Sequence, residues 1–300
     1  MSTPPTPLNI DYIDPDGNDW DLSDYTMSKG YICSAIGGIE GLPVSMQTIP
    51  LLDGTAIPNL YIPQPGTITL VILLSRPASD SENDYYSLLD TATRAFYNRR
   101  NDVPKPGYIQ IQRPDGTTRQ VAVYTTSGLN TPDTVGISNH TVLSLTLQTP
   151  DPFWEDLAKQ QIVFTVSNVA GILPVLPIGL TGGTIIGNNT VVNGGNATAW
   201  PVWTITGPGK PTMQNLTSGR KWSLNTSIPT GQVVQVITKP GQQMAVNTTT
   251  SANIWDQLVL SSLRDLWPLM SGPNQLSIVM AGSSVSTSVG LSWTNRWNRA

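Results

Sequence analysis

The sequence predicts a mainly β protein of two domains, and three observations lead to that prediction. The chain of 300 residues has 26 glycines and 25 prolines, and its short alternating stretches rich in Thr, Val and Ile are separated by turn signals. Its length suits about two domains of ordinary size. Its charges are also divided unevenly between the two halves of the chain.

This charge division places the domain boundary. Residues 1–158 contain 18 acidic and 8 basic side chains, a net charge of −10, whereas residues 159–300 contain 2 acidic and 8 basic, a net charge of +6. Periodicity also breaks at Thr149-Pro-Asp-Pro152. We therefore predict domains at 1–157 and 158–300. A charge of +6 is too dilute for a nucleic-acid footprint, so no recognition of nucleic-acid sequence is expected.

The chain opens with an acidic segment. Residues 8–12 predict a strand that runs into a turn at Asp14-Pro-Asp-Gly17. Six aspartates lie between Asp11 and Asp24 and suggest calcium binding. The spacing does not fit an EF-hand loop, because Gly17 falls at the fourth position and no glutamate follows at the twelfth. We interpret the segment as a solvated acidic hairpin without a metal.

Strand signals then recur through the first domain. Asp53-Gly54 predicts a hairpin within 49–61, and residues 66–74 alternate as a central strand. Pro114-Asp-Gly116 predicts the turn of a hairpin over 107–124. A further alternating strand is expected over 141–149, after His140.

One helix is predicted, over about 81–99. Ser79, Asp80 or Ser81 can cap its start, and the prolines between Asp102 and Gly107 end it. Basic residues near its end suit the negative pole of the helix: Arg94, Arg99 and Arg100. Apolar residues at helical spacing predict a stripe that faces the core: Tyr85, Leu88, Leu89, Ala92 and Phe96.

The second domain reads as a β-sandwich. Its spine is the strand Trp200 to Thr206, for which bulky or β-branched residues on both sides predict cover on both faces. Short strands at regular spacing favour a sandwich over βαβ units. The other candidate strands are 173–179, 184–186, 212–215, 221–224, 233–238, 243–247, 276–280 and 285–293.

Catalytic and cofactor chemistry finds little support in these residues. His140 is the sole histidine and follows no nucleophile-elbow sequence. Asp256 and Asp265 are the only acids of the C-terminal half, so this half offers no other carboxylates for the pair that a glycosidase needs. The stretch Gly207 to Thr212 resembles a phosphate loop, but two of its residues are prolines that cannot donate to phosphate. We predict no enzyme, no catalytic residues, no cofactor and no metal.

Sugar binding is the alternative function. Seven of the nine tryptophans follow residue 199 and could stack on sugars if exposed, although core packing is the favoured interpretation. Trp200 and Trp203 point to opposite sides of one strand, so they cannot form one flat platform without a bulge. The loop from Asn193 to Asn196 could still bind a ligand through its backbone. Binding residues therefore stay unknown.

The chain has no sequence signal for export or membrane insertion. Its N-terminus lacks a basic and apolar leader, and its longest apolar run, about Ile68 to Leu74, falls short of the roughly 20 residues of a membrane span. Cys33 is the only cysteine, so neither a disulfide framework nor a thiolate metal site is expected.

Several motifs resemble one family in order and spacing. They begin with Asp14-Pro-Asp-Gly17, followed by Trp20 and Leu22, and continue through Pro114-Asp-Gly116 and Asp151-Pro-Phe-Trp154. The clearest is the Gly-rich loop at 193–196 with Trp200-Pro-Val-Trp203 and Gly207-Pro-Gly209, followed by 266–274 and 291–300. Together they are similar to the distal tail proteins of long-tailed, siphovirus-type bacteriophages.

This resemblance implies a fold and a role. The first domain would be a β-rich ring-forming, or belt, domain with one helix, and the second a galectin-like β-sandwich. The protein would be a virion component made in the host cytoplasm and placed at the tail tip, where a homohexameric ring joins the tail tube to the tip or baseplate. Its partners would be further copies of itself, the tail tube protein, and the tail-tip hub or receptor-binding proteins. The role involves no catalytic residues.

Overall fold

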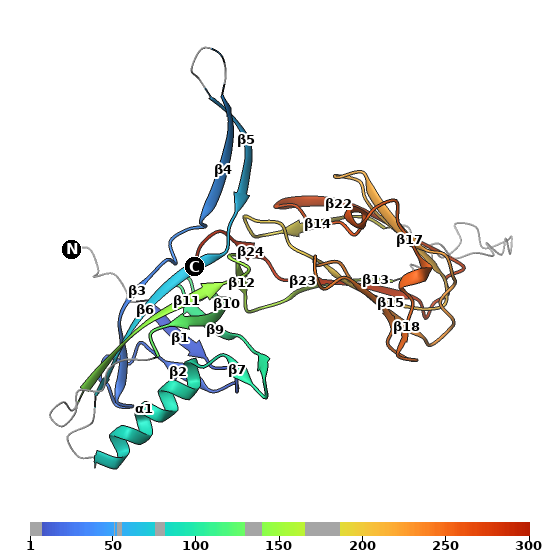
Figure 1. Cartoon of the computed structure of the whole chain (residues 1–300). Coiled ribbons are helices and arrows are strands. Elements are labelled where there is room, and N and C mark those ends of the chain that lie inside the picture. The colour runs from blue at the N-terminus through green and yellow to red at the C-terminus, as the bar shows by residue number, and fades with distance from the viewer. Residues whose placement is uncertain (1–7, 51, 53–55, 76–81, 130–139, 166–186) are drawn as a thin grey trace, which may run out of the picture. The chain divides into compact units, whose positions relative to one another are not determined.

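The computed structural model describes residues 8–50, 52, 56–75, 82–129, 140–165 and 187–300 (Figure 1). The chain divides into two compact units. Unit 1 comprises Met1–Leu157 and Trp297–Ala300, and unit 2 comprises Ala158–Arg296. The predicted range of 158–300 for the second domain is therefore too long, because the last four residues pack with unit 1.

The described part of unit 1 contains the following elements: β1 (Asn9–Ile13), β2 (Asp19–Asp21), β3 (Tyr31–Gly37), β4 (Val44–Pro50), β5 (Ala56–Pro63), β6 (Gly66–Ser75), α1 (Glu82–Phe96), β7 (Arg99–Arg100), β8 (Val103–Pro104), β9 (Gly107–Gln112), β10 (Thr118–Ser127), β11 (His140–Thr149) and β12 (Trp154–Asp156). Strand β24 (Arg296–Trp297) pairs with β12 and brings the C-terminus back to this unit.

An antiparallel sheet in the order β2-β1-β9-β10-β11-β6-β3 forms the body of unit 1. Strand β10 changes partner along its length, because its first part pairs with β9 and its last part with β11. Strands β6 and β11 pair over their whole length, from Gly66 opposite Thr149 to Ser75 opposite His140. These elements confirm the strands predicted over 66–74 and 141–149 and the hairpin over 107–124, whose Gly116 has the positive φ of 83° that its turn requires.

Helix α1 packs on this sheet near both ends. Close to its start, Tyr85 is buried and its hydroxyl hydrogen-bonds the Thr141 hydroxyl of β11. The buried side chains of Ala92, Ala95 and Phe96 join the core of unit 1. The ring of Phe96 stacks on Tyr12 with 4.2 Å between centroids, and the Tyr12 hydroxyl donates to the Ala95 carbonyl at 3.0 Å. The predicted helix is confirmed, but it ends at Phe96 rather than about Arg99.

The predicted end of the helix is wrong, whereas its predicted core-facing stripe is confirmed. The helix ends early because the next residues form the β7–β8 ribbon, where Arg99 pairs with Pro104. The predicted stripe does face the core, since Leu88 and Leu89 are half-buried against it; Ala95, which the stripe did not include, is also buried. The proposed caps at 79–81 and the Asp53-Gly54 turn lie outside the described residues.

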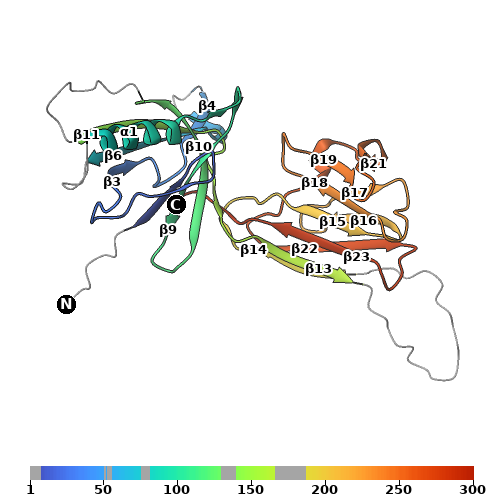
Figure 2. The same ribbon diagram turned by 90° about the horizontal axis from the view of Figure 1, so that it is seen from below.

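The described part of unit 2 contains the following elements: β13 (Gln160–Thr165), β14 (Gly187–Asn193), β15 (Val202–Thr206), β16 (Lys210–Asn215), β17 (Arg220–Leu224), β18 (Val233–Ile237), β19 (Met244–Asn247), β20 (Ala252–Asn253), η1 (Trp255–Gln257), β21 (Leu258–Val259), η2 (Leu263–Asp265), β22 (Gly272–Ala281) and β23 (Ser288–Trp293). Among these residues there is no α-helix (Figure 2).

Unit 2 is a β-sandwich. One sheet has the order β13-β23-β15-β18-β19-β20 and the other β14-β22-β16-β17-β21. Alternate residues of both sheets enter one continuous apolar core. Its centre is a cluster of three fully buried indoles, in which Trp203 meets Trp222 and Trp267 edge to face with 5.8 and 5.4 Å between centroids. The predicted sandwich is therefore confirmed.

The predicted spine of unit 2 is central in its sheet but covered on one face only. Strand β15 lies between β23 and β18, with Trp203 and Ile205 fully buried. Thr204, on its other face, is exposed, so the prediction of two covered faces is wrong. The β-branched residues on that face reflect strand propensity and not burial. The stretches 173–179 and 184–186 lie outside the described residues, and β13 and β14 were not predicted.

Candidate interaction surfaces

The hairpin formed by β4 and β5 projects from the rest of unit 1 (Figure 1). The two strands pair with each other, from Val44 opposite Pro63 to Pro50 opposite Ala56, and form a sheet of their own in the described chain. A two-stranded ribbon is at best marginally stable in water without further cover. Both of its long edges also present unpaired backbone groups.

Both faces of this hairpin expose apolar side chains. Met46 lies opposite Tyr61 on one face, and Leu60 belongs to the other. Six large apolar residues are between 41% and 66% exposed: Val44, Met46, Ile49, Leu60, Tyr61 and Ile62. Because both faces are apolar, packing against the body of unit 1 could cover no more than one of them.

Charged residues are missing from these strands. Strands β3, β4, β5, β6 and β11 contain no Asp, Glu, Lys or Arg, although the first 158 residues hold 26 such side chains, 18 acidic and 8 basic. The outward side of β6 and β11 exposes Thr67, Thr69, Val142 and Ser144. We call the exposed residues of β4, β5, β6 and β11 the charge-free surface. Depletion of charge is typical of the centre of protein–protein interfaces.

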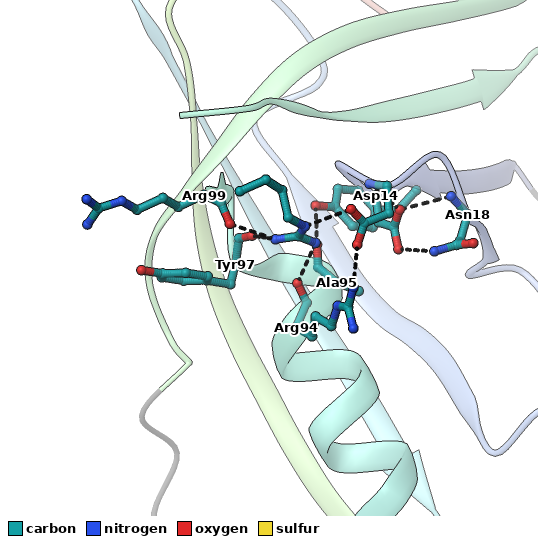
Figure 3. Close-up of polar contacts among 9 residues, drawn as sticks. Asp14, Asn18, Arg94, Ala95, Tyr97 and Arg99 are labelled. Atoms are coloured by element: carbon teal, nitrogen blue, oxygen red, sulfur yellow. Dashed lines mark hydrogen bonds and ion pairs between the residues drawn. The ribbon is translucent and has the colours of Figure 1, made fainter. Parts of the chain in front are cut away.

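The acidic segment, in contrast, is tied to the structure by its own hydrogen bonds. Asp14 is only 5% exposed. Its Oδ1 accepts from the backbone nitrogens of Asp16 and Asn18 at 2.8 and 2.9 Å, and its Oδ2 accepts from Asn18 Nδ2 at 2.9 Å (Figure 3). The interpretation of a wholly solvated hairpin is therefore wrong for Asp14, which closes the turn.

Asp16 joins this turn to the end of helix α1. Its carboxylate lies 2.8 Å from Arg100 Nε and 3.4 Å from Arg94 Nη2. Hydrogen bonding from Arg100 lowers the pKa of Asp16. Arg100 also donates to the carbonyls of Arg94, Tyr97 and Arg99, which lie at and just after the end of α1 (Figure 3). Arg100 therefore caps the helix and fixes it to the acidic turn.

The remaining aspartates show no arrangement for a metal. Burial, followed by the carboxylates of Asp19 and Asp21, raises the pKa of Asp11 to about 6. Hydrogen bonds from Ser28 and Thr26 lower the pKa of Asp24 to about 2. Across the described residues, no group of three or more His, Cys, Asp or Glu side chains could hold a metal ion.

The residues considered for catalysis have structural surroundings. His140 is exposed at the start of β11, opposite Ser75. Asp265 accepts from the backbone of Ser261 and Ser262 and caps the short helix η2, while Asp256 accepts from Gln257. In the stretch that resembles a phosphate loop, the Gly207 and Gly209 nitrogens donate to main-chain carbonyls. The two aspartates and the two glycine nitrogens are thus engaged within the fold.

The Gly-rich loop before β15 is also packed internally. The Asn193 amide donates to the Ala197 and Leu269 carbonyls and accepts from the Gly195 nitrogen. The Gly194 nitrogen donates to Asn295 Oδ1 at 3.1 Å. A Cβ on Gly195 would lie only 2.4 Å from a backbone oxygen, so this close approach requires glycine. These backbone donors are not available to a ligand.

The tryptophans of unit 2 mostly fill its core. Trp203, Trp222, Trp267 and Trp293 are buried, while Trp200 and Trp255 are half-buried outside the long strands. The outward side chains of both sheets are Thr, Ser, Gln, Val, Lys and similar residues, and none of those in the described strands is aromatic. A sheet face without aromatic rings lacks the usual platform for stacking a sugar.

None of the helices in the described chain is both long and apolar enough to cross a membrane.

The chain matches no protein-family model and no curated protein sequence. Its fold, however, is that of a phage tail hub protein over nearly the whole chain. The Dit protein of phage SPP1, described as a paradigm of the hub adsorption apparatus in phages infecting Gram-positive bacteria, superposes with a TM-score of 0.65. The two sequences are 12% identical, and the match covers 97% of this chain and 99% of that one.

Two further structures show the baseplate of phage p2 in its activated conformation, with Sr or with Ca. Their TM-scores are 0.49 and 0.48, at 9% identity, over 96% of this chain and 98% of theirs. The comparison with SPP1 Dit confirms the distal-tail resemblance at the level of fold.

Sequence reasoning did not find the charge-free surface, although a signal was present. Between Glu40 and Arg76 the sequence contains a single charged residue, Asp53. Apolar alternation predicts a half-buried ribbon both for a hairpin that packs on the core and for one that projects from it, so this run by itself predicts only ordinary strands. The structure shows that this ribbon does not pack on the core.

Proposed function

We propose that this chain is a structural protein of a phage tail that forms a closed homo-oligomeric ring, of six copies as the family resemblance implies, at the distal end of the tail. The ring joins the tail tube to the tip or baseplate that carries the host-adsorption proteins. The tail tube protein and the tail-tip hub or receptor-binding proteins are its partners. The chain's role is assembly and not catalysis.

The hairpin β4–β5 carries this proposal. It is apolar on both faces and free of charged residues along its strands, on a chain whose first 158 residues have a net charge of −10. Exposing such a ribbon to water is unfavourable and leaves its edges open to pairing. Contacts with neighbouring subunits on either side would cover its faces and its edges.

A ring follows if the hairpin of one copy binds a different surface of the next. A head-to-tail contact of this kind closes into a ring when the rotation between copies allows it. The outward side of β6 and β11 supplies a second surface without charges, so no buried charge opposes the contact. The fold shared with a phage hub protein supports a cyclic assembly over an open fibre.

Unit 2 serves in this proposal as an outer docking domain of galectin-like type. Its sheets present polar, non-aromatic outward faces, and its loop backbone is engaged internally. Neither observation favours the alternative role of a carbohydrate-binding module. Protein docking requires only a stable, hydrogen-bonding surface, which these faces offer.

The location is tested by labelling intact virions with gold-conjugated antibody against unit 2. We expect gold at the distal end of the tail, and label confined to the capsid or absent from virions would contradict the proposal.

The alternative role of a carbohydrate-binding module is tested by titrating the full chain with host cell-wall polysaccharide. Saturable binding tighter than millimolar, lost on truncating a half-buried tryptophan such as Trp255, would favour the sugar-binding role.

A further inference from the structure

Arg119 is a buried arginine in strand β10, with 4% of its surface exposed. Its guanidinium carbon lies 3.8 Å from the centroid of the Trp297 ring, a cation–π contact. Asp156 accepts a hydrogen bond from Trp297 Nε1 at 2.6 Å, and one of its oxygens lies 3.9 Å from Arg119 Nε. The three side chains come from β10, β12 and β24, and the sequence separates Trp297 from Asp156 by the whole of unit 2.

The residues after Trp297 are held through their main chain. The Arg299 carbonyl accepts from Arg119 Nη1 at 3.0 Å. The Ala300 nitrogen donates to the Ile39 carbonyl at 3.2 Å, in the segment that leads into β4. Figure 1 accordingly shows the C-terminus on unit 1.

The buried guanidinium makes these contacts energetically important. Burial lowers the pKa of Arg119, which reflects the hydration that the cation has lost. A buried charge must recover that loss from hydrogen bonds, a counter-charge and an aromatic face. The C-terminal residues provide the aromatic face and one acceptor, and Asp156 provides the counter-charge. Without those residues, Arg119 would lose two of these three contacts.

We propose that Arg119, Asp156 and the Ile39 carbonyl form a binding site for the chain's own C-terminal peptide, Trp297–Ala300. Its ligand class is a peptide with a tryptophan two residues before an accepting carbonyl. The docked peptide is a clasp that ties unit 2 to unit 1 at a second point, besides the covalent link at Leu157–Ala158. Unit 2 is then an insertion held at both ends, so a load on it is shared between two attachments. This inference does not depend on the proposed tail function.

The clasp is tested by cutting the covalent link in the folded full-length chain. A specific protease site is inserted between Leu157 and Ala158, which are exposed. Residues 1–157 are immobilised through a tag, and the release rate of residues 158–300 after cleavage is measured. We expect slow release from the otherwise unaltered chain. Trp297→Ala should speed release at least about tenfold, because it removes both the ring contact and the hydrogen bond to Asp156.

Two further variants separate the clasp from general damage. Trp297→Phe keeps an aromatic face but loses the Nε1 donor, so its release rate should fall between those of the parent and Trp297→Ala. Arg299→Ala keeps the carbonyl that accepts from Arg119 and should change the rate by less than about twofold. Immediate release from the unaltered chain, or equal rates for Trp297→Ala and Arg299→Ala, would overturn the proposal. If Trp297→Ala does not fold, the same comparison is made with Trp297→Phe.

Discussion

Asp11 lies on β1 directly opposite Asp21 of β2, and Asp19 is two positions further along the same ladder. This strand pairing brings three carboxylates together at the edge of the sheet. Charged edges discourage pairing with other chains, which gives the cluster a structural use at β2. The cluster makes ionisation of Asp11 unfavourable, because burial and the two neighbouring carboxylates raise the pKa of Asp11 to about 6.

We predict that Asp11→Asn stabilises the protein near pH 8 but not near pH 3.5. Since the folded-state pKa is above the ordinary value of 3.8, protonated Asp11 contributes stability below about pH 3.8, and this contribution is lost as the pH rises through about 6. Asparagine is neutral at both pH values, so the variant keeps this stabilising contribution at high pH. The expected gain near pH 8 is about 1 kcal/mol, since solvent screens a half-exposed carboxyl. Urea unfolding of both proteins at the two pH values measures it.

Asp115 provides the opposite control. Hydrogen bonds from Thr117 lower its pKa, so its ionised form stabilises the fold, and that contribution is lost as the pH falls through the lowered value. Asp115→Asn should therefore lower stability near pH 8. A gain from Asp11→Asn of equal size at both pH values would mean that charge repulsion is not its cause.

Trp222 offers a second test at this scale. Within the described structure, the indole nitrogens of Trp203, Trp222 and Trp267 are buried without a hydrogen-bond acceptor. Leaving a buried donor without a partner costs about 1–3 kcal/mol. Trp222→Phe removes that cost while losing some packing, so we expect a net change below about 1.5 kcal/mol, against about 3–5 kcal/mol for Trp222→Ala. Denaturant unfolding measures both, and equal losses would contradict this account of the core.

Helix α1 makes its strongest contact with the core at its last turn. Phe96 is fully buried against Tyr12, whereas the neighbouring Tyr97 is half exposed. We expect Phe96→Ala to cost about 3–5 kcal/mol of unfolding free energy and Tyr97→Ala less than about 0.5. The half-buried Leu89 should fall between them, because its truncation removes only part of a core contact. Thermal unfolding of the three variants ranks them, and a Tyr97 loss as large as that of Phe96 would refute this packing.

The sequence predicted those elements in which the local pattern of apolar residues agrees with the burial of the side chains. Burial alternates along the apolar strand β6, and the hairpin of β9 and β10 has both apolar alternation and a Pro-Asp-Gly turn. Strand β14 was missed because Gly187–Asn193 is rich in Gly, Asn and Thr and has little apolar alternation. It exists because β22 supplies a partner along its whole length. That pairing is tertiary, and local sequence does not encode it.

The interaction surfaces were predicted less completely than the fold. Alternation cannot tell a hairpin that packs on a core from one that projects, as β4 and β5 do. The role of Trp297 depends on a buried arginine 178 positions earlier in the chain, whose partners only the fold brings together. The sequence placed the tryptophans of unit 2 in its core, and the structure confirms this for Trp203, Trp222 and Trp267.

At the scale of the whole molecule, charge is separated from the surface proposed for assembly. Six aspartates lie within residues 11–24, around β1 and β2, while the projecting hairpin has no acidic residue along its strands. Like charges would repel at a contact between identical subunits, so their absence from the hairpin favours association there. The net charge of −4 for the whole chain does not reveal this separation.

Assembly through the hairpin is tested most directly by the mass of the full-length chain in solution. Sedimentation measures this mass for the parent and two variants. We predict a closed assembly of six times the 32.3 kDa of one chain. Tyr61→Asp, which puts a charge on the hairpin, should reduce it to single chains, whereas Tyr25→Asp should not, although the two tyrosines are 66% and 64% exposed. A parent that stays at 32.3 kDa at all concentrations, or a Tyr61→Asp variant that assembles as well as Tyr25→Asp, would contradict assembly through the hairpin.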